Sequence, residues 1–221
     1  MLQDGFPAAV FEPSQRSPDL SPNPHTVFAQ GIAEHLELVR QLQSHYSVLE
    51  VIAIAMSQTL HSGGKIFWCG NGGSAADSQH LCAELVGRFR RERPAIPSVA
   101  LTTNTSILTA IANDYGYDFV FSRQLESLSA PGDLVIGIST SGNSQNVVNA
   151  FKTARSRGMS TIAFTGAGGG AMGQLADHLF AVPSRETARI QEIHILAGHM
   201  LCDWVEEDSV LWLKNETEVQ A

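Results

Sequence analysis

Two pairs of side chains in the sequence have the types and the spacing that acid–base chemistry needs. His80 and Glu84 are four residues apart in CGNGGSAADSQHLCAELVGRF, so they share one face if this segment is helical. Gln191 and His199 are eight residues apart in RIQEIHILAGHML, about two helical turns and on roughly one side. Two such helices side by side would bring together two imidazoles, a carboxylate and an amide.

Each of these residues also has a purely structural interpretation. His80 could be a surface histidine of its helix. Glu84 precedes Arg88 by four residues and could form an i,i+4 ion pair with it. His199 lies among apolar residues and could be partly buried in the core, which is how we interpret His194. The residues alone leave both interpretations open.

Two loops rich in small residues are suited to holding an anion. CGNGGSAA contains glycines that allow a ligand close to the backbone, and we expect Ser74 to cap the helix that follows. GISTSGNSQN places Ser139, Thr140, Ser141 and Ser144 within six residues, between a strand and a helix, where hydroxyls and N–H groups form a phosphate cradle. The first loop could equally be a plain tight turn, and single serines of the second could be helix caps.

An alternation of apolar strands with helices must position these loops. The expected strands are KIFWCG, SVALTT, DLVIGIS, STIAFTG and HLFAVP. This pattern predicts an α/β three-layer sandwich in which a five-stranded parallel sheet is covered by helices on both faces. Ligands of such sheets bind at the carboxyl ends of strands, and both loops directly follow strands.

The flanking segments predict the domain organisation. We expect a disordered proline-rich tail at 1–24, a helical segment of one long helix or two at 25–64, the α/β domain at 65–208, and a C-terminal tail at 209–221. The helical segment and the long last helix both carry apolar stripes. Because one domain cannot easily cover both stripes, we expect a homotetramer with active sites at subunit contacts.

Composition excludes some classes of protein. The net charge of −8 argues against nucleic acid as the main ligand. Three cysteines without a CxxC pair indicate free thiols in a reducing compartment. No apolar run approaches the roughly 18 residues of a membrane span, and no secretory signal is visible. We therefore expect a cytoplasmic protein that does not bind membranes.

The motifs together resemble one enzyme family. CGNGGSAADSQHLCAEL, GISTSGNSQNVVNA and RIQEIHILAGHML are similar to sugar isomerase (SIS) domains, which have a flavodoxin-like fold, and more narrowly to bacterial sedoheptulose 7-phosphate isomerases, or phosphoheptose isomerases. The similarity runs from about His25 to Glu206. It implies an aldose–ketose isomerase that converts sedoheptulose 7-phosphate to D-glycero-D-manno-heptose 7-phosphate through an enediol, for the biosynthesis of nucleotide-activated heptose and of lipopolysaccharide heptose.

The resemblance also implies the roles of individual residues. Glu84 matches the family's catalytic base and His199 its acid. One zinc ion per subunit is implied, with His80, Glu84, Gln191 and His199 as ligands; imidazole and carboxylate suit zinc, whereas an amide is a weak ligand. The implied substrate-binding residues are Asn71, Gly72, Gly73, Ser74, Arg88, Asn113, Asp114, Ser139, Thr140, Ser141, Ser144 and Gln191. Ala188 stands where some family members have an acidic residue, and Asn104 replaces an aspartate that is common in its loop.

Two other functions compete with the enzyme. A non-catalytic SIS-domain tetramer that binds a bacterial replication initiator protein resembles RFRRERP, AIAND and RIQE. That relative lacks the glutamate and the second histidine, so Glu84 and His199 favour the enzyme. A sugar-phosphate-sensing regulator would add a helix-turn-helix domain, for which the tail at 1–24 is too short and too rich in proline.

Overall fold

A five-stranded parallel sheet forms the centre of the computed structural model, which describes residues 23–219, with side chains as far as Leu211. The strand order is β2-β1-β3-β4-β5, and every neighbouring pair is parallel. The strands are β1 (Ile66–Gly70), β2 (Ser98–Ala100), β3 (Leu134–Ser139), β4 (Ser160–Thr165) and β5 (His178–Ala181). The predicted fold class is therefore confirmed. Because β1 and β3 are neighbours, the two candidate anion loops leave the sheet side by side.

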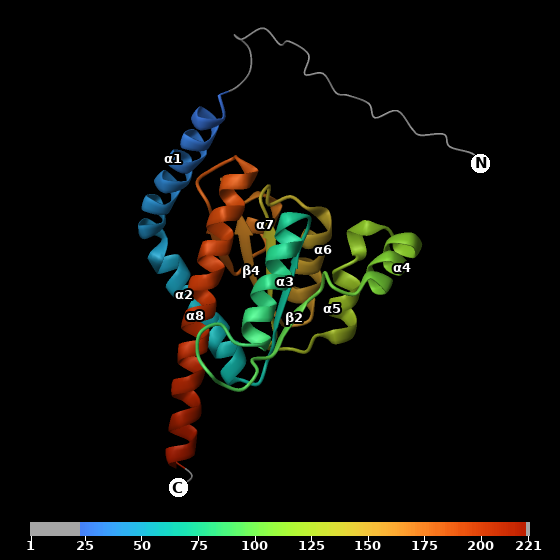
Figure 1. Cartoon of the computed structure of the whole chain (residues 1–221). Coiled ribbons are helices and arrows are strands. Elements are labelled where there is room, and N and C mark those ends of the chain that lie inside the picture. Colours follow the sequence, from blue (N-terminus) through green and yellow to red (C-terminus); the bar gives the residue numbers. More distant parts are fainter. Residues whose placement is uncertain (1–22, 220–221) are drawn as a thin grey trace, which may run out of the picture.

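Helices cover both faces of this sheet (Figure 1). In chain order they are α1 (Pro24–Leu42), the 3₁₀ turn η1 (Gln43–His45), α2 (Tyr46–His61), α3 (Gly73–Val86), α4 (Thr105–Tyr115), the 3₁₀ turn η2 (Tyr117–Phe119), α5 (Ser122–Leu128), α6 (Gln145–Ser156), α7 (Gly170–Gly173) and α8 (Thr187–Val219). The N-terminal segment is thus two helices separated by one turn. The predicted tail at 1–24 lies outside the described residues except for its last two.

Two apolar cores lie on opposite faces of the sheet because the side chains of each strand alternate. Trp68 of β1 belongs to the core under α1, α2, α3 and α8, and Phe67 belongs to the core under α4, α5, α6 and α7. Both side chains are fully buried. All three cysteines are buried free thiols. Within residues 23–219, no helix is both long enough and apolar enough to cross a membrane.

The start of α3 differs from the prediction. Ser74 was expected to cap this helix, and this is wrong, because α3 begins one residue earlier with Gly72 as its N-cap. The positive φ of Gly72, 56°, turns the chain directly from β1 into the helix, a conformation that glycine adopts without steric cost. Ser74 is therefore buried in the first helical turn, where its carbonyl accepts the hydroxyl of Ser78.

Helix α8 is longer than the sequence pattern predicts. It packs beside α3 and α2 and continues to Val219, so residues 209–219 extend the helix beyond the body of the subunit (Figure 1). Its inner side is anchored by buried residues such as Ile190, Ala197 and Leu201. The close packing of α3 against α8 is what brings the two candidate catalytic segments together.

Candidate active site

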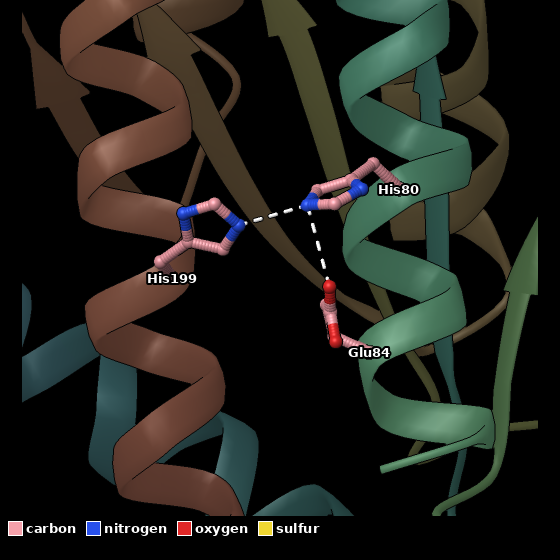
Figure 2. Close-up of side chains that lie close together, drawn as sticks. All are labelled: His80, Glu84 and His199. Carbon is pink, nitrogen blue, oxygen red and sulfur yellow. Dashed lines mark hydrogen bonds and ion pairs between the residues drawn. The ribbon is translucent and has the colours of Figure 1, made fainter. Parts of the chain in front are cut away.

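Three ionisable side chains meet between α3 and α8 (Figure 2). The Nε2 atoms of His80 and His199 are 2.8 Å apart, and His80 Nε2 lies 3.3 Å from Glu84 Oε1. One potential ligand atom from each residue lies within 4.8 Å of the other two. The structure thus brings together three of the four residues that the two helices were predicted to contribute.

Burial and neighbouring charge both act on His199. Burial and the nearby His80 lower the pKa of the His199 imidazole, and the carboxylate of Glu84 opposes that shift. The ring of Phe89 stacks on His199 with centroids 5.4 Å apart and an angle of 16° between the planes. A neutral, oriented imidazole at neutral pH can accept a proton or bind a metal.

The donor set fits a zinc ion. Two imidazole nitrogens and one carboxylate oxygen are ligand types that zinc binds, and three protein ligands are typical of catalytic sites that keep a position open for substrate. Gln191, the fourth predicted ligand, has its side-chain amide against the backbone of Gly73, where an added Cβ would lie 2.6 Å from Nε2. Gln191 therefore connects α8 to the first anion loop.

The second anion loop gathers hydroxyl groups at the carboxyl end of β3. Ser139 Oγ lies 2.8 Å from Ser144 Oγ and 3.3 Å from Ser141 Oγ. Ser144 is the N-cap residue of α6, so the free N–H groups of that helix face the same place. Gly142 has a φ of 65°, and an added Cβ would lie 2.2 Å from the carbonyl of Gly169, so the loop after β4 closes tightly around the cradle.

A pair of side-chain amides joins the two anion loops. Asn71 Nδ2 donates to Asn146 Oδ1 at 2.9 Å, and Asn146 Nδ2 donates back to Asn71 Oδ1 at 2.8 Å. Tyr117 also donates to Asn71 Oδ1 at 3.3 Å. Asn146 is buried and was missed by the sequence analysis, although its place at the start of α6 directly after the serine loop was a signal.

Other predicted site residues lie elsewhere in the subunit. Arg88 is exposed and pairs with Glu92 at 3.4 Å. The Glu84–Arg88 ion pair that a purely structural interpretation predicted is therefore not formed. Asn113 and Asp114 bond to each other at 2.8 Å. They lie on α4, which covers the opposite face of the sheet from α3 and α8.

A further carboxyl group near the site was not predicted. Asp77 precedes His80 by three residues on α3, so the two lie on the same side of the helix. Burial raises the pKa of Asp77, and His80 opposes that rise. Its Oδ2 atom is buried and has no hydrogen-bond partner among the described residues. The i,i+3 spacing in DSQH was the available signal.

Known proteins resemble this chain over most of its length. The SIS domain family model matches residues 28–166. The phosphoheptose isomerase of Akkermansia muciniphila is 54% identical over 178 residues, which is 80% of this chain and 93% of that protein. The phosphoheptose isomerase of Aquifex aeolicus is 56% identical over 156 residues, 71% of this chain and 82% of that protein. The structure of phosphoheptose isomerase GmhA from Neisseria gonorrhoeae superposes with a TM-score of 0.80 at 44% identity, and the match covers 84% of this chain and 100% of that one.

Proposed function

The chain belongs to the phosphoheptose isomerases of the SIS-domain family, and on this premise we propose that it converts sedoheptulose 7-phosphate to D-glycero-D-manno-heptose 7-phosphate. The relatives support this reaction over the replication-initiator alternative. The single observation that carries the proposal at the site is the convergence of His80, Glu84 and His199 within 4.8 Å. A protein that only binds a replication initiator would not need this cluster of acid–base side chains.

The reaction moves one proton between carbons and one between oxygens. Glu84 takes the proton from C1 of the ketose, which leaves a cis-enediol, and returns a proton to C2. His199 donates a proton to the carbonyl oxygen at C2 and accepts one from the hydroxyl at C1, so that the aldehyde forms. Each group is regenerated at the end of the turnover, and the overall reaction neither gains nor loses a proton.

The phosphate is proposed to bind in the cradle formed by Ser139, Ser141 and Ser144. It is carried on C7 and is remote from the reacting carbons. Its binding therefore contributes by positioning C1 and C2 beside Glu84 and His199. The Asn71–Asn146 amide pair supports this role because it couples the cradle to the loop that begins α3.

Zinc is the proposed cofactor, held by His80, Glu84 and His199, with Gln191 as the proposed fourth ligand. When bound, it would polarise the substrate carbonyl and stabilise the negative charge that develops on oxygen. The chain's own contribution is to hold the two imidazoles with their Nε2 atoms facing one point. The lowered pKa of His199 favours the neutral form that a metal ligand requires.

We further propose that the chain acts as a cytoplasmic homotetramer. A groove of about 590 Å³ between α2 and α8 is lined mainly by apolar residues, among them Leu49, Ile54, Met200 and Trp204. Phe28, Ile32 and Leu36 of α1 are also exposed and lie four residues apart along one stripe. A neighbouring subunit is proposed to cover these surfaces, because one chain leaves them open to solvent.

The test is direct conversion of the substrate. Purified protein loaded with zinc is incubated with sedoheptulose 7-phosphate and followed by NMR for the anomeric proton signals of the aldoheptose phosphate. We expect the equilibrium mixture to form, and we expect no conversion of unphosphorylated sedoheptulose at the same concentration. Absence of aldose from the phosphorylated substrate would overturn the proposal.

A further inference from the structure

We propose that Glu206 is a positioning residue for the isomerase reaction: its buried carboxylate fixes the segment 87–94 so that Phe89 holds the His199 ring and Arg93 holds the end of α3 that carries Glu84. This inference rests on the proposed function. Glu206 follows His199 by seven residues on α8, which is two turns along the same face.

The Glu206 carboxylate is saturated by the segment that follows α3. Its Oε1 accepts the backbone N–H of Phe89 at 2.8 Å, and its Oε2 accepts those of Arg90 and Arg91, each at 2.8 Å. The side chain is fully buried. Burial raises the pKa of Glu206, but the three backbone hydrogen bonds and the Arg93 guanidinium outweigh that effect and hold it below its usual value. The carboxylate is therefore ionised at neutral pH and binds the segment as a charged acceptor.

Arg93 extends this clamp to the catalytic helix. Its side chain is 1% exposed, and its Nε lies 3.2 Å from Glu206 Oε1. Its Nη2 donates to the carbonyl of Glu84 at 2.8 Å, and its Nη1 donates to the carbonyl of Gly87 at 3.2 Å. These carbonyls belong to the last turn of α3 and the residue that ends it, groups that have no partner within the helix. One buried ion pair thus connects α8 to the end of α3.

Phe89 carries the effect of the clamp to His199. The backbone N–H of Phe89 is held by Glu206, and its ring stacks on the imidazole. The position of the Phe89 ring therefore depends on the Glu206 carboxylate. The rotation of the His199 ring, which stacks on Phe89, depends on it in turn. Productive catalysis needs groups held within about 0.5 Å and 10–20°. The phosphate cradle lies on β3 and α6 and does not touch the clamp, so a loosened clamp should lower kcat with little change in KM.

The test compares two neighbouring carboxylates of α8. Glu206→Gln keeps the size of the side chain but replaces one acceptor oxygen by an N–H₂ group that opposes the backbone N–H groups. Glu207→Gln is the matched control, because Glu207 is exposed and contacts the same segment only through Arg91 Nη2, at 3.3 Å. For Glu206→Gln we expect kcat to fall by roughly 10- to 100-fold while KM changes less than about twofold. Glu207→Gln should match the wild type.

A readout that does not depend on turnover separates positioning from general destabilisation. The Cε1–H signal of His199, assigned by its loss in His199→Asn, reports the stacked Phe89 ring through its ring current. We expect Glu206→Gln and Phe89→Leu to move this signal in the same direction, Phe89→Tyr to retain the wild-type position and rate, and Glu207→Gln to leave it unchanged. Phe89→Leu leaves the Glu206 clamp intact, so it tests whether Phe89 orients His199 even if Glu206→Gln folds poorly.

Two results would overturn the inference. One is wild-type kcat in both Glu206→Gln and Phe89→Leu. The other is a loss of activity in which the His199 signal does not move, which would make Glu206 a residue of stability alone. If the wild type fails to isomerise the substrate while the His199 signal still responds to Glu206→Gln, the proposed function fails and the clamp itself stands.

Discussion

At the scale of single residues, the spacing of side chains predicted part of the site. The i,i+4 separation of His80 and Glu84 is sufficient to place their atoms 3.3 Å apart, because residues four apart share a helical face. His199 is 119 residues from His80, so its contact depends on how α3 packs against α8. Asp77 and Glu206 were not predicted, because a carboxylate on a helix is usually a solvated group and only burial shows otherwise.

Removal of the metal is the first prediction at this scale. Exhaustive chelation should abolish turnover, and added zinc should restore it. Because imidazoles bind metal only when neutral, zinc affinity should fall by at least about tenfold between pH 7.5 and 5.5, where histidines become protonated. The measurement is competition with a chelator of known affinity at each pH. Full activity in protein shown by elemental analysis to be free of metal would contradict it.

The serine cradle gives a second prediction with a different kinetic signature. Ser141→Ala should raise KM roughly 10- to 150-fold, because one hydrogen bond to a charged phosphate contributes about 1.5–3 kcal/mol, and kcat should change less than about twofold. Ser156→Ala is the control, since this exposed hydroxyl lies at the far end of α6 from the cradle and donates to the Thr153 carbonyl. Steady-state kinetics distinguish a change in KM from a change in kcat. A fall in kcat at constant KM would show that Ser141 does not bind the phosphate.

At the scale of elements, apolar runs and glycines predicted the five strands and the two loops. They did not predict that Gly72 is the N-cap of α3, since the serine two residues later is also a good cap. Nor did they predict the Asn71–Asn146 pair or the Glu206 clamp, because hydrogen bonds between distant segments have no periodic signature. Helix α8 also continues to Val219, past the predicted end of the domain at residue 208.

The buried His194 of α8 should make the stability of the fold depend on pH. Its side chain is fully buried, its Nε2–H donates to the Thr165 carbonyl, and burial lowers its pKa to about 4. In the unfolded chain the imidazole titrates near 6.5. The unfolded state therefore binds a proton first as the pH falls, so this stabilisation is complete above about pH 6.5 and is lost as the pH falls toward 4.

The expected effect is measurable by urea unfolding at fixed protein concentration. Between pH 7.5 and pH 5, His194 should account for a loss of about 2 kcal/mol in the free energy of unfolding. His194→Asn keeps an N–H donor without the titration, so the variant should lose that much less than the wild type over the same range. Equal losses in the two proteins would show that His194 is not the group responsible.

At the scale of the whole molecule, the sequence predicted apolar stripes, and the structure leaves apolar side chains of α1, α2 and α8 exposed, which we propose other subunits cover. Light scattering at micromolar concentration should give a mass near four times 23.8 kDa. Trp204→Glu, in the groove between α2 and α8, should shift the distribution to smaller species, because a buried unpaired charge is costly. Leu128→Glu, at an exposed apolar position of α5, is the comparison. A monodisperse wild-type monomer would contradict the assembly.

The central claim is that Glu84 and His199 perform the proton transfers, and the turnover of Glu84→Gln and His199→Asn on sedoheptulose 7-phosphate tests it most directly. Both variants should fold, assemble as the wild type does and bind the phosphosugar. Gln cannot accept a proton from carbon and Asn cannot transfer one near neutral pH, so each kcat should fall about 10²–10⁴-fold, roughly 3–5 kcal/mol of barrier. Zinc content is measured in each variant so that loss of metal is recognised. Near-wild-type turnover in both variants would contradict the account and leave the two residues as lining of the pocket.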